Sequence, residues 1–250
     1  MAVLERILVG AGPHDLSRRS ALALLQELES YGPPAVGSAS YLEPDHRPEH
    51  GATWPPRGAL AWGTGLVLLE TRWGSLAIEP PLPLAPAPPE PGAGLDRLRL
   101  MLAGDRLIGL VFLRLGAFAV GVLDGERLVA SKSGRRYVHG RHRAGGQSQR
   151  RFERNREKWV QELFDKLCRT CEATLGQHAA GLDHLLFGGD RHVLAQFRKR
   201  CDWLQRLDDR VLPRLVPVGR PGLATLERSA RTVWSCRVFV RSSGETAPPA

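Results

Sequence analysis

The segment LIGLVFLRLGAFAVGVLDGERLVAS, residues 107–131, decides the fold. It contains two apolar runs, at 107–113 and 118–123, and the Asp124-Gly125 pair after the second run is a strong signal for a tight hairpin turn. Residues 127–131 supply a third β-prone run, and a basic loop that contains glycines is predicted to follow at 133–146. We therefore predict three consecutive antiparallel strands in this segment.

Helices and strands alternate after these three strands. A long amphipathic helix is predicted at 148–175, because apolar residues recur there at three- and four-residue steps. The later elements are a strand at 184–187, a helix at 190–207 with Asp190 as its N-cap, a strand at 215–218, a helix at 223–232 and a last strand at 234–240. This order predicts an α/β fold, namely a ribonuclease H-like mixed sheet flanked by helices.

A proline-rich stretch at 80–94 separates this region from the N-terminal part of the chain. Seven of its fifteen residues are proline, which disfavours helix and sheet and favours polyproline II. We interpret it as a linker, and a ligand for a proline-binding domain is the alternative. The N-terminal part is predicted to be a small α+β unit with a helix at 16–31, a hairpin formed by 66–69 and 76–78, and a turn-rich segment at 33–58. The predicted organisation is a small unit at 1–79, a linker at 80–94, a main domain at 95–241 and a tail at 242–250.

The composition is that of a globular protein. Of the 250 residues, 42% are apolar and 24% are charged, which argues against global disorder. No run of 18 apolar residues is present, so a membrane span is not expected, and the N-terminus lacks the apolar core of a secretory signal. Four cysteines do not make a disulfide scaffold. The expected setting is a reducing cytoplasm.

The net charge of +9 is concentrated in one segment. Residues 132–158 carry +8, and the other 223 residues sum to about +1. The ten basic residues of this segment surround a Gly-Gly pair and precede the N-terminus of the long predicted helix: Lys132, Arg135, Arg136, Arg141, Arg143, Arg150, Arg151, Arg154, Arg156 and Lys158. Because helix N-termini already favour anions, arginines at this place indicate an anionic partner, above all a nucleic acid. The alternatives are a solvated charged face and an arginine-rich composition that reflects a GC-rich genome.

The centre of this basic segment reads HGRHRAGGQSQRRFERNREK, residues 139–158. Gly145 and Gly146 let the backbone adopt positive φ and approach a partner closely, and Gln147 follows them on a flexible tip. The tripeptide alone is a weak signal, whereas GGQSxxRFxRxR leading into an amphipathic helix is far more specific. This stretch resembles the catalytic middle domain of the archaeal and eukaryotic class of peptide-chain release factors. That domain also has the order of elements predicted here.

Two departures narrow the resemblance. The chain has no Asn-Ile-Lys-Ser tetrapeptide, which reads stop codons in the classical factors, and it leaves no room for their GTPase-binding domain. A hydrolytic domain without a decoding domain resembles the Vms-like release factors, which act in ribosome rescue. The resemblance implies a peptidyl-tRNA hydrolase that frees nascent chains from stalled large ribosomal subunits without a stop codon. It also implies ribosomal RNA and peptidyl-tRNA as partners, no cofactor, no metal, no membrane, a monomeric state and a cytoplasmic location.

The same resemblance implies roles for individual residues. Gln147 is expected to enter the peptidyl transferase centre, where its backbone N–H binds the oxyanion and its side chain positions water. Gly145 and Gly146 would allow the backbone conformation that this requires. The residues themselves give two further expectations. Phe152 is expected to be a helix-to-sheet core residue, with a base-stacking platform as the alternative. Arg151 and Arg154 have pairing with Glu153 or Glu157 as an alternative to RNA binding. The expected RNA phosphate binders are six arginines: Arg141, Arg143, Arg150, Arg151, Arg154 and Arg156.

Two other functions remain open on the sequence. A non-catalytic RNA- or ribosome-binding module would use the same basic loop and would tolerate the loss of Gln147. A two-metal nuclease would need carboxylates that converge from the first strand, the first helix and the fourth strand. Residues 107–113 contain no acid, and Asp190 together with Glu153 or Glu157 is not sufficient.

The cysteine pattern has two interpretations. Cys168-x-x-Cys171 could indicate a zinc or redox site, but it lies inside a predicted helix. Cys201 and Cys236 do not form a second pair of this kind. Structural thiols are therefore the favoured interpretation.

Overall fold

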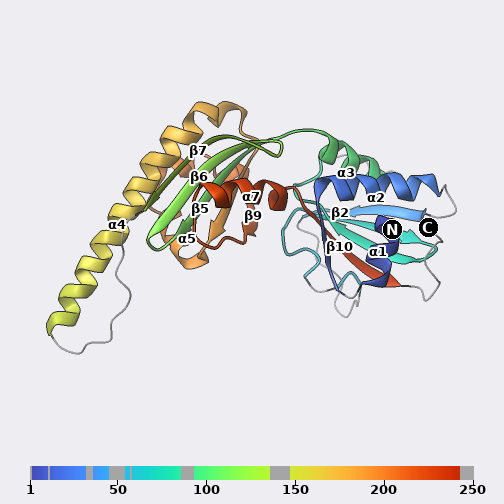
Figure 1. The fold of residues 1–250 in the computed structure, drawn as a ribbon, viewed down its shortest axis with the longest axis horizontal. Coiled ribbons are helices and arrows are strands. Elements are labelled where there is room, and N and C mark those ends of the chain that lie inside the picture. The colour runs from blue at the N-terminus through green and yellow to red at the C-terminus, as the bar shows by residue number, and fades with distance from the viewer. Residues whose placement is uncertain are drawn as a thin grey trace. The chain divides into compact units, whose positions relative to one another are not determined.

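The fold is described from a computed structural model that covers residues 2–10, 12–31, 36–44, 54–56, 58–85, 93–135 and 147–242; of residues 36, 37, 93 and 147–153 it describes the backbone alone. The chain divides into two compact units (Figure 1). The first unit contains Met1–Asp105 together with Arg231–Ala250, and the second unit contains Arg106–Ala230. Each unit has its own five-stranded sheet.

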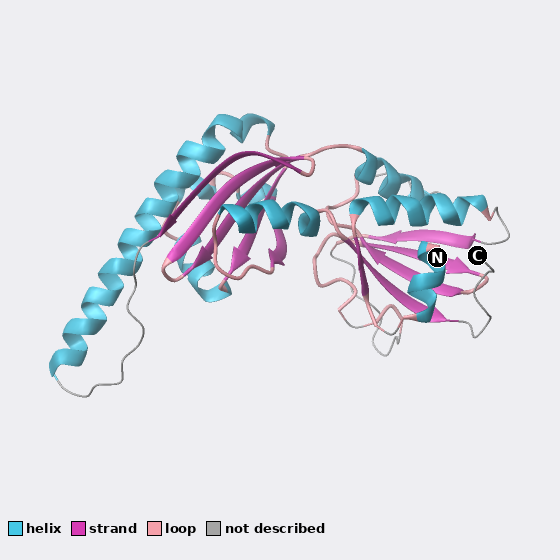
Figure 2. Ribbon diagram, in the orientation of Figure 1, coloured by secondary structure: helices cyan, strands magenta, loops and turns pink. Residues whose placement is uncertain are grey.

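The sheet of the second unit begins with the three strands that the sequence predicts. Strands β5 (Leu107–Arg114), β6 (Ala117–Asp124) and β7 (Arg127–Arg135) are antiparallel neighbours. Strands β8 (His184–Gly189) and β9 (Val211–Val216) then add in parallel beside β5, giving the order β7-β6-β5-β8-β9 (Figure 2). This arrangement confirms the ribonuclease H-like mixed sheet.

Helices cover both faces of this sheet, as predicted. On one face, α4 (Gln147–Leu175), α5 (Arg191–Arg198) and α6 (Asp202–Gln205) share a core with Val111 and Leu113 of β5. The opposite face is covered by α7 (Leu223–Val233), whose Leu226 would lie 3.2 Å from a Cβ added at Gly121. The apolar run of β5 is continuous because its alternate residues enter two different cores.

Among the elements after α4, two differ most from their predicted bounds. The helix predicted at 190–207 is broken into α5 and α6, although Asp190 is its N-cap as expected and accepts from the N–H groups of His192 and Val193 at 2.9 and 3.0 Å. The strand predicted at 215–218 corresponds to β9, which begins four residues earlier and ends two residues earlier. Pro213 and Arg214 interrupt the apolar run of β9, so that the run alone does not reveal the strand. Short 3-10 helices at Gly176–Gly181 and Asp208–Arg210 complete the unit.

The sheet of the first unit is antiparallel throughout. Its strands are β1 (His14–Leu16), β2 (Val36–Leu42), β3 (Leu66–Thr71), β4 (Gly74–Glu79) and β10 (Cys236–Ser242), in the order β1-β10-β4-β3-β2. Three helices belong to the same unit: α1 (Val3–Val9), α2 (Arg18–Ser30) and α3 (Ala93–Ala103). The predicted helix at 16–31 and the predicted hairpin are confirmed as α2 and β3–β4. The segment predicted to be turn-rich contains a strand, β2, while its residues 33–35, 45–53 and 57 lie outside the described part of the chain.

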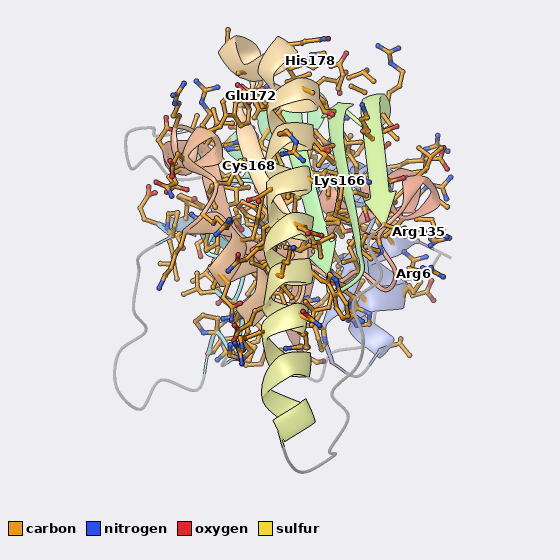
Figure 3. The ribbon with its side chains drawn as sticks, turned by 90° about the vertical axis from the view of Figure 1, so that its left-hand side faces the viewer. Arg6, Arg135, Lys166, Cys168, Glu172 and His178 are labelled. Atoms are coloured by element: carbon orange, nitrogen blue, oxygen red, sulfur yellow. A yellow bond between two sulfur atoms is a disulfide. The ribbon has the colours of Figure 1, made fainter. Side chains whose placement is uncertain are left out.

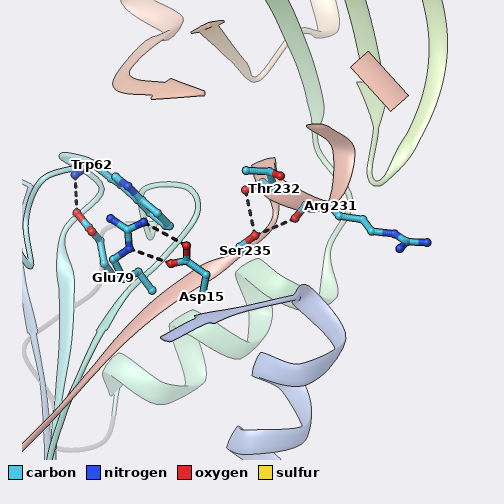
Figure 4. Close-up of polar contacts among 7 residues, drawn as sticks. Asp15, Trp62, Glu79, Arg231, Thr232 and Ser235 are labelled. Carbon is cyan, nitrogen blue, oxygen red and sulfur yellow. Dashed lines mark hydrogen bonds and ion pairs between the residues drawn. The ribbon is translucent and has the colours of Figure 1, made fainter. Parts of the chain in front are cut away.

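The last strand forms where it was predicted but belongs to the other sheet. β10 pairs with β4 over six residues and with β1 over three, so the expectation that it closes the main domain is wrong. Arg237 of β10 also donates from Nε and Nη2 to the Asp15 carboxylate of β1, at 2.8 and 3.2 Å (Figure 4). The first unit is therefore built from both ends of the sequence, which the local pattern of 234–240 could not reveal.

The beginning of the proline-rich stretch packs into the first unit. Leu82 and Leu84 are buried, and Thr64 Oγ1 donates to the Pro80 carbonyl at 2.6 Å. Residues 80–85 thus do not behave as a solvated linker. Residues 86–92 lie outside the described residues, and α3 begins at Ala93.

Arg18 contacts both the residues at the end of α3 and the residue Trp234, which lies just before β10. Its guanidinium donates to the carbonyls of Leu102 and Gly104 at 2.5 and 3.0 Å and pairs with Asp105 at 2.7 Å. The same guanidinium lies 4.2 Å from the ring centroid of the fully buried Trp234. One side chain therefore contacts two segments that are more than 100 residues apart in the sequence.

Replacing Arg18 with alanine is expected to lower the free energy of unfolding of the first unit by about 2–3 kcal/mol, because two carbonyls would lose a charged donor. Arg19 is exposed and next in sequence, so Arg19→Ala is the matched control and should change this free energy by less than about 0.5 kcal/mol. Urea unfolding followed by the fluorescence of the first unit's tryptophans measures both variants. Equal stability of the two variants would show that the contacts of Arg18 do not stabilise the unit.

The cysteines differ from the expectation of free thiols. Cys168 of α4 and Cys201, which precedes α6, form a disulfide with their Cα atoms 5.5 Å apart. Cys171 and Cys236 are buried free cysteines. The prediction of structural thiols is thus wrong for Cys168 and Cys201. The packing of α5 and α6 against α4 brings these two residues together although they are 33 positions apart.

Candidate functional site

The Gly-Gly-Gln tripeptide lies between β7 and α4. β7 ends at Arg135, and α4 begins at Gln147, the last residue of the tripeptide. Gly145, Gly146, Arg141 and Arg143 lie outside the described residues. For Gln147, Arg150, Arg151 and Phe152 the backbone is part of α4, and their side chains lie outside the description. The structure thus fixes the place of Gln147 in the helix.

Helix α4 is much longer than the part of it that packs on the sheet. Its 29 residues span about 43 Å at 1.5 Å per residue. Its core-facing residues are Val160, Leu163, Phe164, Leu167, Cys171 and Leu175. The thirteen residues 147–159 precede this set and extend α4 by about 20 Å. Figure 1 shows this end of α4 running past the strands of its own unit. We call residues 147–159 the projecting segment.

The described side chains of the projecting segment are mostly exposed. Arg154, Asn155, Glu157 and Lys158 are exposed, whereas Arg156 is half-buried. Arg156 precedes Val160 by one helical turn and therefore lies on the face of α4 that continues into the core. Its Nε is buried and donates no hydrogen bond to any described residue. The two described arginines of the predicted RNA-binding set thus differ in burial: Arg154 is exposed, and Arg156 is half-buried where α4 leaves the sheet.

The second unit has a positive net charge and the first unit does not. That unit has 24 basic and 13 acidic residues, a net charge of +11, whereas the first unit has 11 basic and 13 acidic residues, a net charge of −2. The first turn of α4 contains no acidic residue. The positive end of the helix dipole and the arginines of the projecting segment therefore attract anions to the same place.

Edge strand β7 continues this basic region. The sequence predicts the strand only to residue 131 and a loop from 133, but pairing with β6 continues to Arg135. The predicted start of the loop is therefore wrong by three residues. Lys132 and Arg135 are exposed on this strand. The sequence shows that both residues belong to the basic segment, and the structure shows that both lie on the edge strand that leads to the loop.

A close contact fixes the end of β7. A Cβ added at Gly134 would lie 2.4 Å from Cζ of Phe118, a fully buried residue of β6. Any larger residue at 134 would push the end of β7 away from the core. The chain therefore leaves the sheet from a defined point before it reaches the Gly-Gly-Gln tripeptide.

The other candidate centres are not assembled among the described residues. The Asp190 carboxylate is occupied as the α5 N-cap. In the described ranges, no group of three or more His, Cys, Asp or Glu side chains could hold a metal ion. Burial lowers the pKa of His184, at the start of β8. No helix of the described part combines the length and the apolar character needed to span a membrane.

Comparison with known families bears on the second unit. The model of the Actinobacteria/chloroflexi VLRF1 release factor family matches residues 106–239. The chain belongs to this family. The match to the VLRF1 family begins at the first residue of the second unit and ends within β10.

Curated relatives of this VLRF1 family member are archaeal release factors. The chain is similar to "Peptide chain release factor subunit 1" of Archaeoglobus fulgidus, at 31% identity over 147 residues, which is 57% of this chain and 36% of the relative. It is also similar to the protein of the same name from Aeropyrum pernix, at 31% identity over 136 residues, which is 54% of this chain and 36% of the relative. The chain thus spans about a third of the length of these relatives.

Two solved structures resemble parts of the chain. One is an archaeal translation termination factor, aRF1, with 20% identity, a TM-score of 0.41 and coverage of 88% of this chain and 73% of that one. The other is titled "Vms1 mitochondrial localization core", with 12% identity, a TM-score of 0.44 and coverage of 68% and 74%.

Proposed function

We propose that this VLRF1 family member is a stop-codon-independent release factor that hydrolyses peptidyl-tRNA on stalled large ribosomal subunits. One observation carries the proposal beyond the family. The glutamine of a Gly-Gly-Gln tripeptide is the first residue of a helix that projects about 20 Å beyond its own core. A tip on such a projection could enter a narrow site that the globular part of the unit cannot enter.

The start of α4 at Gln147 has a chemical consequence. The first four backbone N–H groups of an α-helix have no acceptor within the helix, and that of Gln147 is the first of them. This donor can therefore point to a ligand, and the helix dipole favours negative charge there. Both properties suit the oxyanion that forms when water attacks an ester carbonyl.

In the proposed reaction, water attacks the carbonyl carbon of the ester that joins the nascent peptide to the terminal ribose of the tRNA. The N–H of Gln147 stabilises the oxyanion, and its side chain positions the water. One such donor contributes about 10²–10³ in rate. The two glycines before it allow the backbone to approach the substrate. The proposal requires no cofactor of the chain itself.

The basic residues around the tripeptide would bind RNA phosphates. We expect Arg154→Ala to weaken binding to large ribosomal subunits and to lower the slope of log K against log salt by about one. Arg228 of α7 is also exposed and belongs to the same unit, so Arg228→Ala is the matched control and should leave the slope unchanged. Filter binding at several potassium chloride concentrations measures the slope. Equal slopes for the two variants would contradict a phosphate contact at Arg154.

A non-catalytic module that binds RNA or ribosomes is the second candidate, because exposed basic residues serve binding without chemistry. Peptide release from ribosomes programmed with a stop codon, a sense codon or no codon in the decoding site separates the candidates. A release factor of the proposed kind frees labelled peptide at similar rates in all three cases. Release only at the stop codon would contradict independence from decoding, and binding without release would favour the second candidate. We further propose that the protein acts as a monomer in the cytoplasm.

A further inference from the structure

One turn of α4 is joined to the end of α5 by three adjacent contacts. The rings of Phe164 and Phe197 lie 5.7 Å apart between centroids, and Arg200 Nε donates to Asp165 Oδ1 at 2.9 Å. The third contact is the disulfide between Cys168 and Cys201. We call these three pairs the α4–α5 patch. It holds the corner between α5 and α6 on the docked half of α4.

The two sulfur atoms of the patch have different surroundings. Cys201 is fully buried, whereas Cys168 is partly exposed on the flank of α4 (Figure 3). Cys168 is therefore the member of the pair that a thiolate from solvent is expected to attack. Cys171, one turn further along α4, is fully buried, and burial raises its pKa, so that it stays a protonated thiol and does not compete for exchange.

The second unit does not depend on this bond for its core. The aromatic pair and the Arg200–Asp165 ion pair involve neither cysteine, so we expect both to remain when the disulfide is opened. Leu163, Leu167 and Leu204 are also buried in the shared core next to the patch. Opening the bond therefore leaves a folded unit in which the two thiols stay close enough to pair again.

We propose that Cys168 and Cys201 are a reversible redox pair, whose oxidation fastens the α5–α6 corner to α4. In a reducing cytoplasm, disulfides that occur are mostly transient or redox-sensing. The inference rests on the proposed function only in placing the protein in the cytoplasm. The closed pair would stabilise the unit that carries the Gly-Gly-Gln tripeptide under oxidising conditions.

Reduction and oxidation of the pair each need one external reagent, a dithiol and a peroxide respectively. For reduction, a thiolate of a dithiol attacks the sulfur of Cys168, and Cys201 leaves as a thiolate and takes up a proton. The second thiol of the reductant then releases Cys168, so that the protein gains two electrons and two protons while the dithiol becomes a disulfide. For oxidation by hydrogen peroxide, the thiolate of Cys168 becomes a sulfenic acid, and the thiol of Cys201 displaces water from it to form the bond.

The expected effect is on stability rather than on activity. The bond closes a loop between residues 33 positions apart and restricts the unfolded chain, so the oxidised second unit should melt on the order of 5–10 °C above the reduced one. Peptide release at 25 °C should differ by less than about twofold between the two forms, because the projecting segment lies outside the patch.

The test uses the full-length protein cycled between dithiothreitol and hydrogen peroxide without denaturant. Each sample is then unfolded and alkylated with iodoacetamide, and its intact mass is measured. We expect four modified cysteines after reduction and two, Cys171 and Cys236, after oxidation, through repeated cycles. A bond that dithiothreitol opens only in denaturant would show a fixed structural disulfide and overturn the proposal, as would a failure of peroxide to form it.

Variants make the assignment specific. Cys168→Ser, at the partly exposed member, should abolish the peroxide-dependent rise in melting temperature, whereas Cys171→Ala should keep it. Persistence of the rise in Cys168→Ser would assign it to another group and overturn the proposal. The readouts are thiol number and melting temperature, so a chain that failed to release peptide could still show the redox pair.

Discussion

Gly146→Ala is expected to lower the rate of peptide release by at least about 100-fold. In the proposed reaction the backbone before Gln147 approaches the ester closely, and a Cβ at 146 would restrict its conformation and displace the N–H that we propose stabilises the oxyanion. The loss of one such donor costs about 10²–10³ in rate. Gln147→Ala keeps this N–H and removes only the side chain that positions water, so it should retain more activity than Gly146→Ala. Single-turnover release of labelled peptide gives both rate constants.

The control for Gly146→Ala is binding. The variant should bind large ribosomal subunits as tightly as the wild type, because no basic residue is removed. Its melting temperature should also be unchanged, because residue 146 precedes α4 and the core-facing residues of α4 begin at Val160. Wild-type release by the Gly146→Ala protein would contradict the proposed role of the tripeptide, whatever the result for Gln147→Ala.

Asn155→Pro is expected to lower peptide release by about 100-fold while leaving the second unit folded. Asn155 is exposed in the middle of the projecting segment, and proline there removes a backbone hydrogen bond and kinks or breaks the helix. The tip would then lose its position relative to the docked half of α4. A displacement of about 1 Å can already cost 10²-fold in rate. The measurement is the same single-turnover assay.

Asn155→Ala is the matched control for this prediction. Alanine keeps the helix and removes the same side chain, so release should stay within about twofold of the wild type. In Asn155→Pro, the free energy of unfolding of the second unit should change by less than about 1 kcal/mol, because the projecting segment can fray without loss of core contacts. Full activity of Asn155→Pro would show that a rigid projection is not needed.

The sequence predicts the second unit well because its signals are local. The Asp124-Gly125 turn joins two strands that pair with each other, and the three- and four-residue spacing after Gln147 identifies α4 to within one residue of its observed start. Where polar residues occur in a buried strand, as Arg214 does in β9, the same signals shift the predicted bounds. Local patterns thus determine the element types and their order along the chain.

The same patterns cannot show which sheet a strand joins. β10 has an ordinary strand pattern, and only its pairing with β4 assigns it to the first unit. The disulfide of Cys168 and Cys201 depends in the same way on the packing of α5 and α6 against α4. At Leu82 and Leu84 the local pattern is misleading. The prolines around them suggest a linker, whereas the two side chains are buried in the first unit.

For the candidate site, the sequence predicts the chemistry and the structure adds the geometry of α4. The Gly-Gly-Gln tripeptide and its arginines are visible as a motif, and the helix after them is visible as a three- and four-residue apolar spacing. The point at which α4 leaves the core, at Val160, requires the sheet to be known. That point defines the projecting segment, in which Arg154 is exposed and Arg156 is half-buried.

Single-turnover hydrolysis on isolated large ribosomal subunits that carry labelled peptidyl-tRNA, with no small subunit and no messenger RNA, measures codon-independent release by itself. We expect the wild-type protein to free the peptide and Gly146→Ala to occupy the same subunits without freeing it. Subunits that are saturated with wild-type protein and still retain the nascent chain on its tRNA would show that the protein is not a release factor of the proposed kind.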